Sequence, residues 1–176
     1  MTRERDERAR RFDALARAHG ADLYRFALWL CGHEALARDL VQETFLRAWK
    51  ALDALRDDGA ARSWLITILR REYARTFERK VPKLVDIDAV PVQETGAPGP
   101  DRHTERDLLR EAIAQLPPRY REPLLLQVVI GLSGAEIAQA LDISQSAVMT
   151  RLFRAREKLM ARVQRDGITG TIDGPF

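Results

Sequence analysis

Four side chains suited to reading nucleic acid share one side of the helix predicted to begin near residue 145. The outward residues are Ser146, Thr150, Phe153 and Arg154. At about 100° per residue they lie opposite an apolar stripe of Val148, Leu152, Ala155 and Leu159. An arginine can donate two hydrogen bonds to a guanine edge, a hydroxyl can bond a base or a phosphate, and an apolar ring can meet a thymine methyl group. The spacing therefore predicts a DNA-reading helix.

Two N-terminal capping signals place this helix in a helix-turn-helix. Ser133 stands three residues before Glu136, which is the spacing of a capping box, and Ser144 can cap the next helix. A short helix, a turn of three to four residues and a second helix is the helix-turn-helix pattern. Because such pairs also occur without DNA, a plain helical hairpin is the alternative.

A second stripe that mixes an aromatic residue with cations lies on the helix predicted over residues 61–79. It consists of Trp64, Thr67, Arg71 and Arg75, and the apolar side of that helix carries Leu65, Ile68, Leu69 and Thr76. Guanidinium groups neutralise phosphates, and aromatic rings stack on exposed bases at about 1–3 kcal/mol each. The stripe indicates a nucleic-acid surface, although a tryptophan near a helix start can equally pack into a core.

A polar patch accompanies the helix predicted over residues 34–53. Its predicted core-facing stripe is Leu36, Leu40, Val41, Phe45 and Ala48. Beside or opposite that stripe stand Asp39, Gln42 and Glu43, which from their types alone are solvated polar residues.

The sequence contains no catalytic or metal-binding constellation. Cys31 is the only cysteine, so we expect a buried apolar role, and whether it has a redox role stays open. The three histidines are scattered and match no ligand spacing. No nucleophile, Walker or dinucleotide motif is present, so we expect a protein that is not an enzyme and uses no cofactor or metal.

Positive charge gathers in two separated segments. The formal net charge is +3, but residues 62–80 carry +4 and residues 151–165 carry +5 in an otherwise acidic chain. Two basic helices suggest a polyanionic partner that is contacted at two places. Two solvated helix faces are the alternative that charge alone leaves open.

Helical periodicity predicts an all-α fold of two small helical domains. We expect helices near residues 6–19, 21–31, 34–53 and 61–79 in an N-terminal domain of residues 1–80. Four prolines and two glycines predict a flexible linker over residues 81–104. The helix-turn-helix belongs to a domain of residues 105–164, and a flexible tail covers residues 165–176. No apolar run approaches the roughly 18 residues of a membrane span and no signal core follows the charged N-terminus, so we expect a cytoplasmic protein without membrane insertion.

Three segments in sequence resemble the two-domain bacterial sigma factors of the extracytoplasmic-function type. "ARDLVQETFLRAWKAL" is similar to that family's polymerase-docking helix, and "SWLITILRREYARTFERK" resembles its promoter-melting helix. "LPPRYREPLLLQVVIGLSGAEIAQALDISQSAVMTRLFRAREKL" resembles its C-terminal helix-turn-helix domain. The resemblance covers about residues 10–80 and 105–163 and implies a promoter-specificity subunit of RNA polymerase.

The resemblance also implies roles for individual residues. Core RNA polymerase, with its β′ and β subunits, is the implied partner, and Asp39, Gln42 and Glu43 match the positions that contact β′. The loop over residues 53–61 matches the segment that captures a base flipped from the promoter DNA, at a cost of a few kcal/mol of unstacking. The downstream and melting contacts fall on Arg56, Asp57, Arg62, Trp64, Thr67, Arg71 and Arg75. The upstream contacts fall on Ser146, Met149, Thr150, Arg151, Phe153 and Arg154.

Two positions depart from the family pattern. Met149 stands where many relatives carry lysine or arginine, and Ala61 stands where a larger apolar residue is frequent. Both changes bear on which promoter sequence is preferred.

The resulting expectation is a sigma factor that recruits core polymerase to promoters and assists strand opening during transcription initiation. The family resemblance further implies an anti-sigma factor as a partner. The rival hypothesis is a helix-turn-helix regulator with an N-terminal sensing or dimerisation domain, which would leave Asp39, Gln42, Glu43 and the first basic helix without a role.

Overall fold

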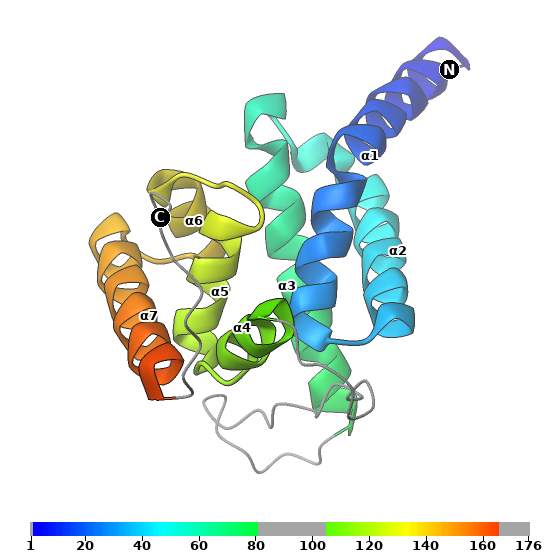
Figure 1. Cartoon of the computed structure of the whole chain (residues 1–176). Helices are drawn as coiled ribbons and strands as arrows, with labels where there is room; N and C mark the ends of the chain where they lie inside the picture. The colour runs from blue at the N-terminus through cyan, green and yellow to red at the C-terminus, as the bar shows by residue number, and fades with distance from the viewer. Residues whose placement is uncertain (1, 81–104, 166–176) are drawn as a thin grey trace. The chain divides into compact units, whose positions relative to one another are not determined.

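The computed structural model describes residues 2–80 and 105–165 (Figure 1). All regular elements in these ranges are helices, and none is a strand. The chain divides into two compact units, Met1–Leu84 and Val85–Phe176. The all-α class and the two helical domains are thereby confirmed. The linker predicted over residues 81–104 and all but the first residue of the predicted tail lie outside the described residues. None of the helices in the described ranges combines the length and the hydrophobicity of a membrane span.

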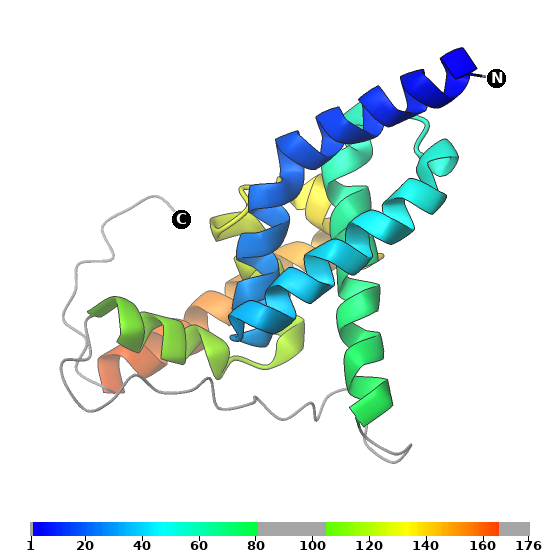
Figure 2. The ribbon, with the colours of Figure 1, turned by 90° about the vertical axis from the view of Figure 1, so that its right-hand side faces the viewer.

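Three helices make up the N-terminal unit. They are α1 (Thr2–Cys31), α2 (Glu34–Lys50) and α3 (Ala61–Lys80), and two short 3-10 turns, η1 (Leu52–Ala54) and η2 (Asp58–Ala60), join the last two. Figure 2 shows α1 crossing α2 and α3, with its N-terminal turns continuing beyond them. The predicted helix over residues 34–53 is therefore too long, because the chain tightens into η1 after Lys50 and buries both Leu52 and Leu55.

The prediction of two helices over residues 6–19 and 21–31 is wrong, because α1 runs unbroken through Gly20. Leu15 and Leu23 are buried on either side of that glycine, so the apolar face continues across it. Packing along this face outweighs the cost of about 1 kcal/mol of a glycine inside a helix. The helix ends instead at Gly32, whose positive φ of 66° suits a residue without a Cβ.

The buried stripes of α2 and α3 are rotated relative to the predicted ones. On α2 the buried residues are Ala37, Leu40, Thr44 and Ala48, whereas Leu36, Val41 and Phe45 are half-buried. On α3 the chain buries Leu65, Ile66, Leu69 and Glu72, whereas Ile68 and Thr76 are half-buried. Neighbouring positions on a helix differ by only about 100°, and the packing partner decides which of them faces inward.

Four helices make up the C-terminal unit: α4 (Glu105–Ala114), α5 (Pro118–Val128), α6 (Gly134–Leu141) and α7 (Gln145–Arg165). The capping box at Ser133 and Glu136 is formed. Ser144 accepts a hydrogen bond from the Ala147 amide at 3.2 Å, as the sequence predicts. Asp142 takes a left-handed φ of 54° between α6 and α7 and turns the chain. The helix-turn-helix is thereby confirmed.

Candidate nucleic-acid and polymerase interfaces

The outer side of α7 carries five of the six residues predicted to read the upstream DNA element. We call these five the reading face, and all of them are exposed: Ser146, Met149, Thr150, Phe153 and Arg154. Met149 and Phe153, the two large apolar side chains of this face, keep 61% and 59% of their surface exposed. Arg151, the sixth, is half-buried at the edge of this face.

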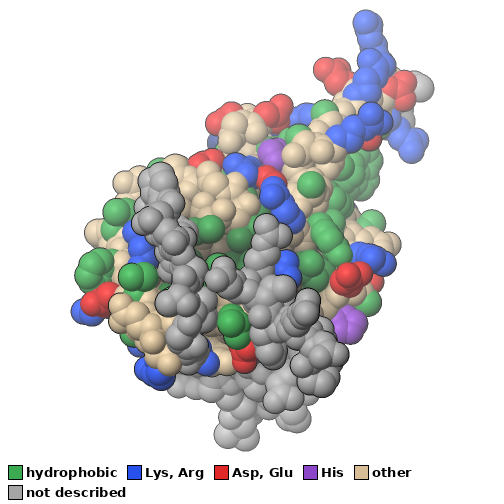
Figure 3. Space-filling model, in the orientation of Figure 1, with side chains coloured by type: hydrophobic (Ala, Val, Ile, Leu, Met, Phe, Trp, Pro, Cys, Tyr) green, Lys and Arg blue, Asp and Glu red, His purple; other side chains and the backbone are tan. Residues whose placement is uncertain are grey.

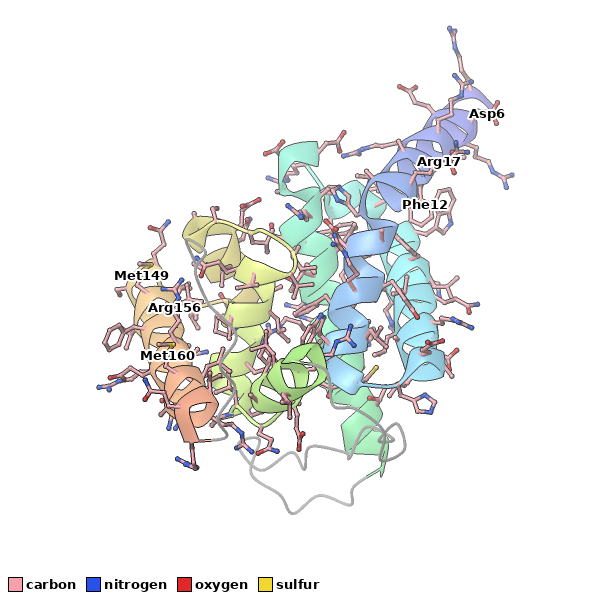
Figure 4. All side chains as sticks on the ribbon, in the orientation of Figure 1. Asp6, Phe12, Arg17, Met149, Arg156 and Met160 are labelled. Atoms are coloured by element: carbon pink, nitrogen blue, oxygen red, sulfur yellow. The ribbon has the colours of Figure 1, made fainter. Side chains whose placement is uncertain are left out.

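The opposite side of α7 anchors it in the unit. Val148, Leu152 and Ala155 are fully buried, as predicted, and Leu159 is half-buried. Arg156 donates a hydrogen bond to Gln127 Oε1 of α5 at 2.7 Å, a tie between helices that the sequence analysis missed. Figure 4 shows Met149, Arg156 and Met160 along this helix. The reading face therefore stands on a helix fixed by its buried side.

The guanidinium of Arg154 is paired on the surface in a way that lets another acceptor replace its present partner. Its guanidinium pairs with Glu157 one turn further on, with an N–O distance of 2.7 Å, and lies 5.9 Å from the centre of the Phe153 ring. Both members of the pair are about half exposed, and exposed ion pairs contribute little stability. A guanine edge or a phosphate can replace the Glu157 carboxylate at small cost.

The predicted nucleic-acid stripe of α3 is divided between core and surface. Trp64 is half-buried and packs on a cluster of Leu15, Leu52, Leu55 and Ala61, so the core role that was weighed for it is present. Thr67 is half-buried and donates a hydrogen bond to the Ser63 carbonyl at 2.9 Å. Arg71 and Arg75 are exposed. These two arginines are therefore accessible to the phosphates of a nucleic-acid backbone.

A buried carboxylate links α2 to the arginines of α3. Glu72 is only 6% exposed, and its Oε1 lies 2.6 Å from Arg75 Nη1 and 3.0 Å from Arg47 Nε. Arg47 Nε also lies 3.1 Å from Glu43 Oε1. From the sequence, Glu72 enters only in the net charge of residues 62–80. Through Arg47 and Glu72, a series of ion pairs connects Glu43 on α2 to Arg75 on α3.

The three residues predicted to dock on polymerase, which we call the docking patch, lie on the outer side of α2. Asp39 and Gln42 are exposed, and Glu43 is half-buried in its pair with Arg47. Their acidic and amide oxygens form a polar surface next to the exposed side chains of Leu46 and Trp49. Such a mixed surface can accept hydrogen bonds from a cationic partner and bury apolar area beside them.

The connection between α2 and α3, residues 51–60, carries Arg56 and Asp57 on the surface; we call it the α2–α3 loop. Asp57 caps η2, because its Oδ1 accepts a hydrogen bond from the Gly59 amide at 2.9 Å. Arg56 is exposed. Asp57 is thus held in a short, structured loop, and Arg56 lies exposed beside it.

Arg62 faces α1, unlike the exposed arginines of α3. Its Nη2 lies 2.7 Å from Asp22 Oδ2. Burial works to raise the pKa of Asp22, but hydrogen bonds from Arg25 and Arg62 outweigh it and hold that pKa below its ordinary value of 3.8. Burial and the charge of Arg62 lower the pKa of the neighbouring His19. The carboxylate is therefore charged and the imidazole neutral at pH 7.

Cys31 is buried at the end of α1, as predicted, and its thiol donates a hydrogen bond to the His33 carbonyl at 3.3 Å. Burial raises the pKa of this thiol above its ordinary value of 9.0. The protonated thiol is a poor nucleophile and a poor metal ligand.

Both units match the models of known protein families. Residues 15–81 match the family model of sigma-70 region 2, and residues 106–159 match that of sigma-70, region 4. The ECF RNA polymerase sigma factor SigL of Mycobacterium tuberculosis is 37% identical over 164 residues, covering 89% of this chain and 90% of the relative. SigM of Bacillus subtilis, with the same description, is 30% identical over 157 residues and covers 87% and 95%.

Two solved structures share the architecture. The sigma factor RpoE of Bartonella quintana, in complex with the anti-sigma factor NepR, superposes with a TM-score of 0.69 at 25% identity, covering 88% of this chain and 98% of that one. CnrH, in complex with the cytosolic domain of CnrY, gives a TM-score of 0.64 at 27% identity and covers 90% of each chain.

Proposed function

Because the chain belongs to the extracytoplasmic-function (ECF) family of RNA polymerase sigma factors, which direct RNA polymerase to promoters, we propose that its two helical units contact two separate promoter elements. The C-terminal unit reads the upstream element, and the N-terminal unit binds core polymerase and helps to open the downstream element. The protein performs no covalent chemistry itself; it supplies binding energy and selectivity.

The observation that carries this proposal is the reading face of α7. Hydroxyl, aromatic and guanidinium groups project together from the second helix of a helix-turn-helix, while the opposite side of that helix is buried. An α-helix fits the major groove, where each base pair presents a distinct pattern of donors and acceptors. Arg154 and Thr150 are suited to base or phosphate oxygens, and Phe153 is suited to a thymine methyl group.

In the N-terminal unit, three surfaces are proposed to make three different contacts. The docking patch on α2 binds the β′ subunit of core polymerase. Arg71 and Arg75 on α3 hold the DNA backbone, since their exposed guanidinium groups can replace counterions on phosphates. The α2–α3 loop, with Arg56 and Asp57 at its outer turn, receives the flipped base.

An anti-sigma factor is the proposed inhibitory partner. RpoE and CnrH, two structural relatives, were each solved with a protein partner, and the partner of RpoE is an anti-sigma factor. Phe153, Met149 and Met160 leave large apolar surface exposed along α7 of this chain. A partner that covers these side chains would block the reading face and bury apolar area at the same time.

The rival hypothesis of a helix-turn-helix regulator with a sensing or dimerisation domain is not favoured. The matched region 2 model covers residues 15–81, which include the docking patch and the first basic helix, the two features that the rival leaves without a role.

Reconstitution with core RNA polymerase tests the proposal. We expect the purified chain to bind core enzyme and to produce run-off transcripts from discrete start sites, and mapping those sites gives the promoter sequence. Repression of transcription driven by another sigma factor would favour the rival regulator. Failure to bind core enzyme in the absence of any inhibitor would overturn the proposal.

A further inference from the structure

The N-terminal half of α1 contacts the α2–α3 loop through one face. Arg8, Arg11, Phe12 and Leu15 follow the i, i+3, i+4, i+7 spacing of a helix side. Figure 3 shows charged side chains gathered on the projecting N-terminal end of α1, and Figure 4 marks this part of the helix by Asp6, Phe12 and Arg17. Every residue of the four-residue face contacts the loop or the end of α2.

Arg11 bridges two acceptors in the loop. Its Nη2 donates to the Leu55 carbonyl at 2.7 Å and to Asp58 Oδ1 at 2.7 Å, and its Nε donates to the same Oδ1 at 3.0 Å. Leu55 and Asp58 flank Arg56 and Asp57, the two residues proposed to contact the flipped base. A single guanidinium therefore ties together both ends of the turn that carries them.

Arg8 holds the beginning of the same loop. Its Nη1 donates to Asp53 Oδ2 at 2.9 Å and its Nη2 donates to the Trp49 carbonyl at 2.8 Å. The guanidinium also lies 5.1 Å from the centre of the Trp49 ring. Phe12 packs edge-on against that ring, with the ring centres 5.2 Å apart. The end of α2 and the first turn of the loop are thus fastened to α1.

We propose that Arg11, supported by Arg8, is a positioning residue that sets the conformation of the α2–α3 loop before DNA arrives and thereby sharpens selectivity for the downstream promoter element. The proposal rests on the function assigned above to this loop. A short loop that must be ordered during binding loses conformational entropy at that moment, and a preformed one does not. Guanidinium groups suit this role, because their fork can satisfy a carbonyl and a carboxylate together.

The contacts are placed to position the loop rather than to stabilise the whole unit. Asp53 and Asp58 are exposed, with 79% and 64% of their side-chain surface accessible, and exposed ion pairs add little to folding stability. If these contacts were purely structural, removing them would lower the stability of the unit and weaken binding to all DNA sequences alike. If they position the loop, removing them changes the preference among downstream sequences and leaves the upstream preference unchanged.

The test uses the full-length chain with core polymerase and a promoter library that is randomised over the downstream element and carries a fixed upstream element taken from the mapped promoters. In Arg11→Gln we expect the ratio of transcripts from preferred and non-preferred downstream sequences to fall about fivefold, the equivalent of losing one charged hydrogen-bond bridge. We also expect faster hydrogen exchange of the loop amides. Unchanged preference in a folded Arg11→Gln variant would overturn the inference.

Arg17→Gln is the matched control. Arg17 lies on the same helix and pairs with Asp13 of that helix at 3.0 Å, with both side chains well exposed. The substitution removes the same charge without touching the loop, so downstream preference should stay as in the unmodified chain. A loss equal to that of Arg11→Gln would show a general charge effect and overturn the inference. Arg11→Lys keeps the charge without the fork and should recover only part of the preference.

Asp58→Asn tests the bridge from the loop side. If Arg11 acts through this contact, the double variant Arg11→Gln, Asp58→Asn loses less preference than the sum of the two single variants. Strict additivity would contradict the bridge. Should Arg11→Gln fail to fold, Arg8→Gln, whose acceptor Asp53 is exposed, takes its place with the same expected direction.

Variants of the loop itself separate this inference from the function on which it rests. If Arg56→Ala and Asp57→Ala alter downstream preference and Arg11→Gln does not, the positioning role alone is overturned. If neither loop variant alters it, the base-capture role of the loop and the positioning role fail together.

Discussion

Arg154 is held at the edge of the reading face by two neighbours on its own helix. The carboxylate of Glu157 and the ring of Phe153 keep its guanidinium close to α7 while leaving it accessible. A side chain that is already oriented loses less rotamer entropy when it binds a base or a phosphate. Local contacts along α7 therefore orient Arg154 for the proposed DNA contact without contributing much to the fold.

Arg154→Ala should cost about 1–3 kcal/mol of discrimination at one position of the upstream element, because a paired guanidinium is lost. Competition binding of holoenzyme to promoters that differ at single base pairs measures the effect. Lys158→Ala is a control on the same helix, since Lys158 lies over the Tyr120 ring and is not part of the reading face. Unchanged selectivity in Arg154→Ala would remove this residue from the reading face.

Asp22 gives the N-terminal unit a pH-dependent tie between α1 and α3. Its folded pKa lies below 3.8, so its contribution to stability is fully present above about pH 4 and is lost as the pH falls through the lower folded value. Asp22→Asn should therefore destabilise the chain by about 1–2 kcal/mol at pH 7, and the difference should shrink below about pH 4. Denaturant unfolding at several pH values measures it.

Asp13→Asn is the control for that experiment. Asp13 lies on the same helix and forms a well exposed ion pair with Arg17 at 3.0 Å, so its replacement should change stability by less than about 0.5 kcal/mol. A difference between Asp22→Asn and the unmodified chain that stays constant down to pH 2 would contradict the assigned role of the Asp22 carboxylate.

At the scale of elements, the start of α6 sets the helix-turn-helix. The Ser133 hydroxyl accepts a hydrogen bond from the Glu136 amide at 3.3 Å, and the Glu136 carboxylate accepts one from the Ser133 amide at 2.8 Å. These two bonds satisfy amides that a helix start would otherwise leave without partners. They fix where α6 begins, and with it the turn that aims α7.

Ser133→Ala should lower the stability of the C-terminal unit by about 1 kcal/mol, because it removes the capping hydroxyl. For a unit of this size the midpoint of thermal unfolding should fall by about 4–8 °C. Ser133→Thr keeps a capping hydroxyl and should lose much less. Equal losses in the two variants would argue that the hydroxyl does not cap α6.

At the scale of the whole molecule, the surfaces proposed for polymerase binding and for upstream recognition lie in different units. The docking patch belongs to the first unit and the reading face to the second. A change in one of these surfaces should therefore leave the specificity of the other intact.

Asp39→Ala should weaken binding to core polymerase about tenfold, since it removes an exposed carboxylate from the docking patch. The complexes that still form should keep the promoter preference of the unmodified chain. Fluorescence titration with core enzyme and sequencing of the transcripts measure the two quantities. Glu34→Gln is a control on the first turn of the same helix, where Glu34 pairs with Arg38 at 3.0 Å. Unaltered affinity in Asp39→Ala would contradict the docking assignment.

The sequence by itself determined the features that depend on neighbours along the chain. The capping box at Ser133, the apolar stripe through Val148 and Leu152, and the outward position of Phe153 all follow from the spacing of residue types along the chain, and the structure confirms them. A capping box needs only residues three apart, and an apolar stripe needs only helical periodicity, so a sequence pattern is enough to predict both.

Only the tertiary structure decided the features that join distant segments. It carried α1 through Gly20, rotated the buried stripe of α2, and placed Glu72 between Arg47 and Arg75. It also brought Arg11 to Asp58, 47 residues further along the chain. Helical periodicity states which residues share a side of a helix but not which other helix covers that side. The packing of α1, α2 and α3 against one another makes that choice.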